Sequence, residues 1–373
     1  MRARGEALLV ALTVSALVLT GCGRAATPPS PDIPPLGRLG RWDGATFAPV
    51  TPGGITSGHL YVLVHGWAAG YSRAVDEYPG PGPLLAWDPQ ARNGRGEQFL
   101  EVWLAPMAAA LSQLDPLATV VAFSWIDQSA TTASPFGARI SQSRTVPNGE
   151  RLGIAMNEAL SAGFAEAGGR VHVLGHSHGA KVATIGSLAL TPPPAQLTLF
   201  DSVDTVVPAL AGADNHLVPY LRRLPIGRGP GMTFVDNYFS EFGRAYGNDP
   251  GLSAIVDVSL PPDEFSRWEL QDRHLYPPRW YTAAAQQPAA GVGPQWSPLL
   301  GTTYERLGPY YVTAAAGDAA EQLVLKPATR PAAPTPWSFV RHWAWPLADA
   351  LLLVVLVPCL LIVGRRRRAV RRG

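Results

Sequence analysis

Residues 171–179 read Val-His-Val-Leu-Gly-His-Ser-His-Gly and carry the strongest indication of the fold. A β-branched run leads straight into the pattern Gly-x-Ser-x-Gly, and the stretch from Ala180 to Leu190 has the composition of a helix. Such a pattern mounts a serine on a sharp strand-to-helix turn, with its hydroxyl raised above a sheet. Gly175 and Gly179 suit this turn because neighbouring backbone comes too close for a Cβ. The stretch therefore predicts Ser177 as a nucleophile.

A second element lies upstream, where the apolar run from Leu60 to Val64 ends in His65, Gly66 and Trp67. An enzyme that transfers acyl groups needs two backbone N–H groups aimed at the developing oxyanion. One follows the nucleophile, and the other comes from the loop after an earlier strand. Trp67 and His178 occupy these two positions and are the predicted oxyanion hole. We expect His65 to support the shape of its loop rather than to act as the base.

These two motifs resemble, in order and spacing, the lipase and esterase members of the α/β-hydrolase family. The resemblance covers roughly residues 55 to 285. It implies an α/β-hydrolase fold, in which helices flank a mainly parallel central sheet. It also implies a triad in which the acid and then the histidine follow the serine along the chain.

Beyond Gly179 the chain has three histidines, namely His216, His274 and His342. His274 comes after the strand-like run from Leu252 to Leu260, and the family places its histidine on the loop after the final strand. We therefore predict His274 as the general base.

Two aspartates follow strand-like runs beyond the serine. Asp201 ends the run from Gln196 to Phe200, and Asp236 ends the run from Met232 to Val235. In most α/β-hydrolases the acid follows the second strand after the nucleophile, whereas in pancreatic-type lipases it follows the first. Asp201 is the preferred acid and Asp236 the alternative.

Several other classes of chemistry find no support in the sequence. His176 and His178 are two residues apart, but no further His, Cys or carboxylate completes a zinc set, so we expect no metal. No nucleotide or phosphate fingerprint follows a strand, and the predicted chemistry needs no cofactor. The formal net charge is +2, of which the first 21 residues contribute +1 and the final nine residues +6. The remaining −5 on residues 22–364 argues against nucleic acid as a partner.

The N-terminus resembles the signal of a bacterial lipoprotein. Arg2 and Arg4 precede the apolar run from Ala7 to Leu19, and the run closes in Leu-Thr-Gly-Cys at Cys22. Lipidation of Cys22 would attach the mature chain to the outer face of a membrane. A proline-rich tether follows.

At the other end, residues 343–363 form an apolar segment about as long as the ~20 residues that span a bilayer. Six arginines follow it and predict a cytoplasmic C-terminus. The second cysteine, Cys359, lies within this segment, so no disulfide is expected. Both ends predict a catalytic domain on the extracytoplasmic side of a bacterial cell membrane. The sequence carries no signal for an oligomeric state.

The expected organisation has six parts, and the activity belongs to the third. We expect a serine hydrolase that cleaves carboxylic esters, with a lipid or other acyl ester as substrate. An acyltransferase or peptidase would use the same residues, and a non-catalytic surface module would keep the same fold. The parts are a signal peptide (1–21), a tether (22–40), the catalytic domain (41–325), a Pro/Ala-rich linker (326–342), a transmembrane helix (343–363) and a basic tail (364–373).

Overall fold

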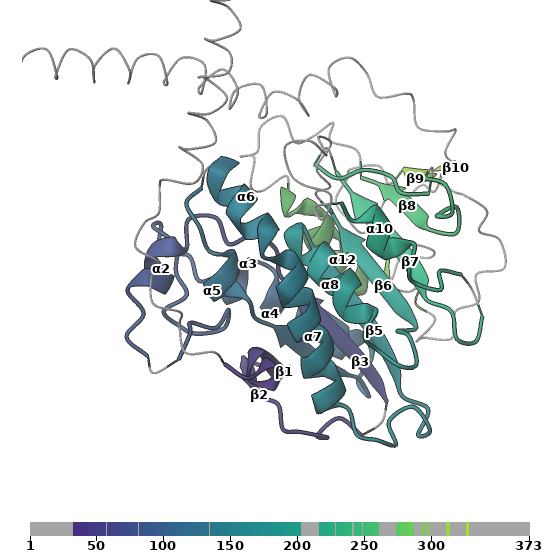
Figure 1. Ribbon diagram of the computed structural model, residues 1–373, viewed down its shortest axis with the longest axis horizontal. Helices are drawn as coiled ribbons and strands as arrows, with labels where there is room; N and C mark the ends of the chain where they lie inside the picture. Colours follow the sequence, from purple (N-terminus) through teal and green to yellow (C-terminus); the bar gives the residue numbers. More distant parts are fainter. Residues whose placement is uncertain are drawn as a thin grey trace, which may run out of the picture. The chain divides into compact units, whose positions relative to one another are not determined.

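The computed structural model is a mixed α/β structure built on one sheet of ten strands (Figure 1). The structure describes residues 33–56, 58–80, 82–133, 135–202, 216–227, 229–240, 242–247, 249–260, 274–286, 293–294, 297, 311–313 and 326–327. The strands lie in the order β10-β9-β8-β7-β6-β5-β3-β4-β1-β2. Neighbours from β4 across to β9 pair in parallel, whereas β1, β2 and β10 pair antiparallel at the edges.

The parallel strands at the centre of the sheet, β3 to β6, coincide with apolar runs of the sequence. A parallel sheet covered on both faces favours such continuous runs over an alternating pattern. The strands are β1 (Leu39–Trp42), β2 (Phe47–Pro49), β3 (His59–Val64), β4 (Thr119–Phe123), β5 (Arg170–His176), β6 (Gln196–Phe200), β7 (Phe234–Phe239), β8 (Val256–Ser259), β9 (Tyr311–Thr313) and β10 (Lys326–Pro327).

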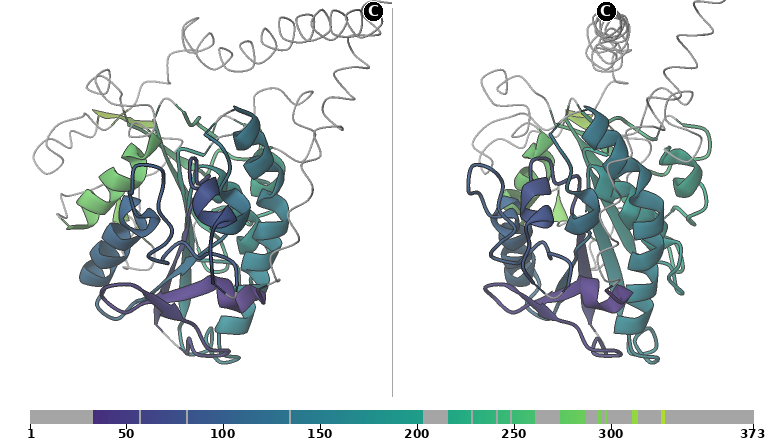
Figure 2. Two further views of the ribbon diagram at one scale, coloured as in Figure 1. Left: turned by 90° about the vertical axis from the view of Figure 1, so that its left-hand side faces the viewer. Right: turned by 60° about the vertical axis from the view of Figure 1, so that its left-hand side comes forward.

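Helices cover both faces of the sheet and give three layers, as the turned view on the left of Figure 2 shows. One face packs on α7 and α8, and the other packs on α4 and α12. The described helices are η1 (Pro35–Arg38), α2 (Ser72–Asp76), α3 (Phe99–Val102), α4 (Leu104–Leu114), α5 (Ile126–Ser129), α6 (Pro135–Ser143), α7 (Thr145–Ala159), α8 (His178–Ser187), α10 (Val218–Leu221) and α12 (Tyr276–Gln286).

Successive residues of a strand point to opposite faces, so each strand contributes to both cores. On β3, Leu60, Val62 and Val64 face α7 and α8, whereas Tyr61 and Leu63 face α4 and α12. All five side chains are buried. This burial makes the centre of the sheet rigid, and the rigid strands fix the positions of the loops at their ends.

The folded body is longer than the predicted catalytic domain at both ends. Ile33 to Ala333 form one compact unit. Residue 41, the predicted start of the domain, lies inside β1, and Arg38 and Leu39 before it are buried. The predicted linker begins with β10, which pairs with β9. Strand β8 was expected to be the last of the sheet, but β9 and β10 follow it along the chain.

The predictions for the two ends of the chain fall outside the described residues. These are the signal peptide, Cys22, the apolar segment 343–363, Cys359 and the basic tail. Of the described helices, none combines the length and the apolarity that crossing a bilayer requires.

Candidate functional site

Ser177 lies at a sharp turn between β5 and α8. Its φ of 56° and ψ of −126° are rare for a residue with a side chain, and such strain concentrates at functional sites. Its backbone N–H donates to the carbonyl of Phe200 on β6, at 2.8 Å. A Cβ on Gly179, the second residue of α8, would lie 2.3 Å from the carbonyl oxygen of His65. Glycine at 179 is therefore what lets α8 begin directly against the loop after β3.

The loop after β3 lies against the serine. A Cβ on Gly66 would lie 2.7 Å from Cβ of Ser177 and 2.7 Å from the carbonyl oxygen of His176. The next residue, Trp67, stacks its indole on the imidazole of His178 with 6.3 Å between ring centroids. The two residues that carry the predicted oxyanion donors therefore contact each other through their side chains. Within the described part of the chain, neither backbone N–H has a backbone acceptor.

His65 holds the shape of this loop. Its Nδ1–H donates to the carbonyl of Gly66 at 2.9 Å, and its Nε2 accepts the backbone N–H of Trp125 at 3.0 Å. The indole N–H of Trp125 donates back to the carbonyl of His65 at 2.6 Å. Burial lowers the pKa of His65 to about 4, which the Gly66 hydrogen bond and the charge of Asp127 partly offset. A neutral, doubly bonded imidazole suits a supporting role.

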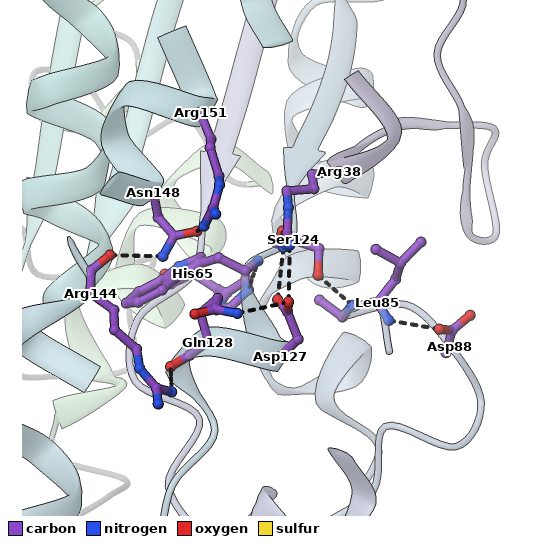
Figure 3. Close-up of polar contacts among 12 residues, drawn as sticks. Arg38, His65, Leu85, Asp88, Ser124, Asp127, Gln128, Arg144, Asn148 and Arg151 are labelled. Atoms are coloured by element: carbon purple, nitrogen blue, oxygen red, sulfur yellow. Dashed lines mark hydrogen bonds and ion pairs between the residues drawn. The ribbon is translucent and has the colours of Figure 1, made fainter. Parts of the chain in front are cut away.

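A buried ion pair between Arg38 and Asp127 lies near His65 (Figure 3). The guanidinium of Arg38 binds both carboxylate oxygens of Asp127, at 2.7 and 3.0 Å, and also donates to the carbonyl of Ser124. The two side chains are 2% and 3% exposed. The pair joins η1, before β1, to the start of α5 and so fixes the chain after β4.

His178, the first residue of α8, contacts α6. Its Nδ1 lies 3.0 Å from Oγ of Ser141 on α6. Burial lowers the pKa of His178 to about 3, and the neighbouring His274 and Lys181 act in the same direction. The residue therefore remains neutral and links α6 to the turn at Ser177.

The predicted base contacts the preferred acid. Nδ1 of His274 donates to Oδ2 of Asp201 at 3.1 Å. The His274 side chain is 23% exposed and that of Asp201 is fully buried. With Nδ1 as the donor, Nε2 of the neutral ring is left as the basic nitrogen.

The carboxylate of Asp201 is held by three further donors. Oδ1 accepts the backbone N–H groups of Ser240 and Gly243, at 2.6 and 3.2 Å, and Oδ2 accepts the Ser240 hydroxyl at 2.5 Å. Asp201 itself has a φ of 43°, and its N–H donates to the carbonyl of Tyr238 at 2.8 Å. Both carboxylate oxygens are thus saturated, and one of them is directed at His274.

Asp236 occupies a different environment, although it was the alternative acid. Strand β7 continues to Phe239, so Asp236 lies inside the strand rather than at its end. Its carboxylate accepts hydrogen bonds from the Thr198 hydroxyl and from the Gln196 amide, at 2.5 and 3.1 Å. Burial raises the pKa of Asp236 to about 7, against these two hydrogen bonds. The sequence prediction ended this strand too early, and Asp236 makes no contact with His274.

His274 lies beside the turn that bears Ser177. Its ring centroid is 4.6 Å from that of His176, the residue directly before the serine. It also lowers the pKa of His178, the residue directly after the serine, although burial is the larger cause. In the described part of the chain, no hydrogen bond joins the Ser177 hydroxyl to His274. Such bonds are often long in a ligand-free site and shorten when substrate binds.

The sequence predicts that His176 and His178 form no metal site. Among the described residues, no group of three or more His, Cys, Asp or Glu side chains could hold a metal ion. His176 and His178 point to different partners, namely the carbonyl of His274 and the hydroxyl of Ser141. The two histidines therefore share no ligand site.

No family model matches the chain, and no curated protein matches it. Three contributors to the site were missed in the sequence: His176, Ser240 and Gly243. Their roles depend on chain segments far apart, and no local pattern marks Ser240 or Gly243. His176 had a signal in the sequence, because Pro277 and Pro278 cannot donate a backbone N–H to the carbonyl of His274.

Proposed function

We propose that this chain is a serine hydrolase of the α/β-hydrolase family that cleaves carboxylic esters through an acyl-enzyme. One observation carries the proposal: Ser177 lies on a strained strand-to-helix turn, beside a histidine whose Nδ1 is bonded to the buried carboxylate of Asp201. The chain order serine, aspartate, histidine and the run of parallel strands support the family assignment.

In the proposed reaction, Ser177 Oγ attacks the acyl carbon of the ester while Nε2 of His274 takes the hydroxyl proton. The N–H groups of Trp67 and His178 stabilise the oxyanion. The tetrahedral intermediate then collapses, and His274 gives its proton to the departing alkoxide, so that an alcohol leaves. Water attacks the acyl-enzyme with the same proton transfers and releases the carboxylic acid. Asp201 keeps the imidazole in the correct tautomer and stabilises its protonated form.

The test uses the full-length chain in detergent. A fluorophosphonate probe should label the wild type, and p-nitrophenyl esters of increasing acyl length should be hydrolysed. Ser177→Ala should abolish labelling and lower ester hydrolysis by at least 10³-fold. Hydrolysis with the Ser177→Ala variant as fast as with the wild type, or no labelling of folded wild type, would contradict the proposal.

The same assay separates hydrolysis from acyl transfer and from peptidase activity. Adding competing alcohol or amine acceptors to the ester assay would divert the acyl group from water in a transferase. Peptide substrates provide the third comparison. We expect water to be the preferred acceptor and esters to be cleaved faster than amides.

We further propose that the enzyme is held on the extracytoplasmic face of a bacterial membrane by lipid on Cys22 and by a helix within residues 343–363. The sequence of both termini supports this proposal. The lipoprotein-like N-terminus and the arginines at the C-terminus both predict that the domain lies on the extracytoplasmic side. A lipid analogue should label the wild type but not Cys22→Ser. Protease added to intact cells should digest the domain that contains Ser177. Protection of that domain in intact cells would contradict the topology.

A further inference from the structure

His176 has contacts that the reaction above does not use. Its side chain is 5% exposed and packs edge-on against Trp103, with ring centroids 6.0 Å apart. Its Nε2–H donates to the backbone carbonyl of His274 at 2.9 Å, and its ring lies 4.6 Å from the ring of His274. Ninety-eight positions separate these two residues along the chain.

The carbonyl of His274 needs a donor from elsewhere. In a helical turn it would accept the N–H of the residue three or four positions later. Those residues are Pro277 and Pro278, and proline has no backbone N–H. A buried carbonyl without a donor costs about 1–3 kcal/mol. His176 supplies the missing donor from β5.

We propose that His176 is a positioning residue that docks the His274 segment on the strand bearing Ser177. This role rests on the proposed function. Because His176 precedes Ser177 directly, a single hydrogen bond to residue 274 sets the base relative to the nucleophile. The Asp201 contact orients the His274 ring, whereas the His176 contact holds its backbone.

The position also requires His176 to stay neutral. Burial holds the pKa of His176 well below its usual value, and the neighbouring His274, His178 and His65 lower it further. The hydrogen bond to the His274 carbonyl acts in the opposite direction. A neutral ring places no second positive charge beside the imidazolium that forms on His274 during the reaction.

The test compares variants of His176 in the full-length chain. Gln places an amide N–H close to where Nε2 lies, Asn is one methylene too short to reach, and Phe keeps the ring without a donor. The matched control is His172→Phe, on the same face of β5, because His172 contacts Thr198 and Tyr61 instead. Rates are normalised to the folded fraction by circular dichroism.

We expect His176→Phe and His176→Asn to lower kcat roughly 100-fold with KM within about threefold of the wild type, because a small misplacement of the base slows chemistry more than binding. His176→Gln should recover most of kcat, and the control should keep it. Equal activities for the Gln and Asn variants, or a kcat for His176→Phe within threefold of the wild type, would overturn the proposal.

A spectroscopic measurement separates this inference from the proposed function. With ¹⁵N-labelled histidine, the Nδ1 proton that His274 shares with Asp201 should give a low-field signal, which is assigned by its loss in His274→Gln. The signal should disappear or broaden in His176→Asn and persist in His176→Gln and in the control. This readout needs no activity, so the positioning role of His176 can be tested even if the wild type hydrolyses no ester. An unchanged signal in His176→Asn would show that the hydrogen bond from His176 does not position His274.

Discussion

Ser177 and Asp201 leave adjacent parallel strands in the same way, each at a positive φ and each donating its N–H to the next strand. The acceptors are the carbonyls of Phe200 and Tyr238, both at 2.8 Å. The two residues are therefore fixed by the hydrogen-bond ladder of the sheet rather than by flexible loops. This explains how a strained backbone persists at both positions, since the surrounding strands over-determine it.

The first prediction separates the two candidate acids. Asp201→Asn should lower kcat by as much as about 10⁴-fold, because the amide neither stabilises the imidazolium nor matches the donors from Ser240 and Gly243. Asp236→Asn should leave kcat within about threefold of the wild type. Ester hydrolysis and fluorophosphonate labelling measure both. The reverse ranking of the two variants would assign the acid to Asp236.

The second prediction concerns the pH dependence of stability. Asp236 has a pKa of about 7 in the folded protein against an ordinary 3.8, so the folded protein binds this proton more tightly. Its favourable contribution to the free energy of unfolding is full below about pH 4 and is lost as the pH rises to about 7. At ~1.4 kcal/mol per pKa unit, the loss amounts to a few kcal/mol.

Asp236→Asn should therefore gain stability relative to the wild type as the pH rises from 4 to 8. The Gln196 amide can turn to accept from the new Asn, because its Oε1 has no partner among the described residues. Denaturant unfolding at several pH values measures the effect. Asp43→Asn is the control: Asp43 accepts backbone N–H bonds from Thr46 and Ala45, which lower its pKa below the ordinary 3.8. Its effect on stability is therefore confined to pH values below about 4, and the stability of this variant relative to the wild type should stay nearly constant from about pH 4 to 8. Parallel pH profiles for wild type and Asp236→Asn would contradict the argument.

The third prediction tests the contact between the loop after β3 and the turn at Ser177. Gly66→Ala should lower kcat by roughly 100-fold and destabilise the protein by about 1–3 kcal/mol, because the new Cβ meets Ser177 and the His176 backbone. Gly94→Ala is the control, since its Cβ would meet nothing within 4 Å. Steady-state kinetics and thermal unfolding measure both variants. A fully active Gly66→Ala variant would show that the loop can move away.

The fourth prediction concerns the buried ion pair of Arg38 and Asp127. Arg38→Met should cost about 3–5 kcal/mol, because it leaves the Asp127 carboxylate buried without its cation. Arg38→Met combined with Asp127→Leu should recover most of this loss. A double-mutant cycle by chemical denaturation measures the coupling. Additive losses in the double variant would mean that the two side chains do not depend on each other.

Much of the parallel core could be predicted from sequence, because a strand buried on both faces needs a continuous apolar run. The run from Gln196 to Phe200 predicts β6 with its observed bounds. The runs from Leu60 to Val64, from Ala118 to Trp125 and from Arg170 to Leu174 predict β3, β4 and β5 to within two residues at each end. Helices were harder to bound. The apolar spacing from Glu97 to Leu114 predicts one helix, but the structure divides it at Trp103 into α3 and α4. The spacing from Pro147 to Ala167 likewise predicts one helix, and the observed α7 runs from Thr145 to Ala159 instead.

The sequence prediction ended a strand at Asp236, but β7 continues to Phe239. Asp236 and Asn237 are polar and resemble the end of a strand, yet both are buried inside β7. Thr198 and Gln196 satisfy Asp236, whereas Asp257 accepts from Asn237 at 2.7 Å. The partners lie on neighbouring strands, and polarity along one strand cannot reveal them.

The sequence by itself determined the turn at Ser177, because glycine spacing, a β-branched run and a following helix are local properties of consecutive residues. Tertiary structure decided which carboxylate meets His274, since Asp201 and His274 are 73 positions apart and come together only across the ends of the strands. It also decided that His176 supplies the donor which Pro277 and Pro278 withhold. Backbone chemistry near a residue can be deduced from its neighbours in the chain, but the partner that completes a buried hydrogen bond depends on how distant segments pack.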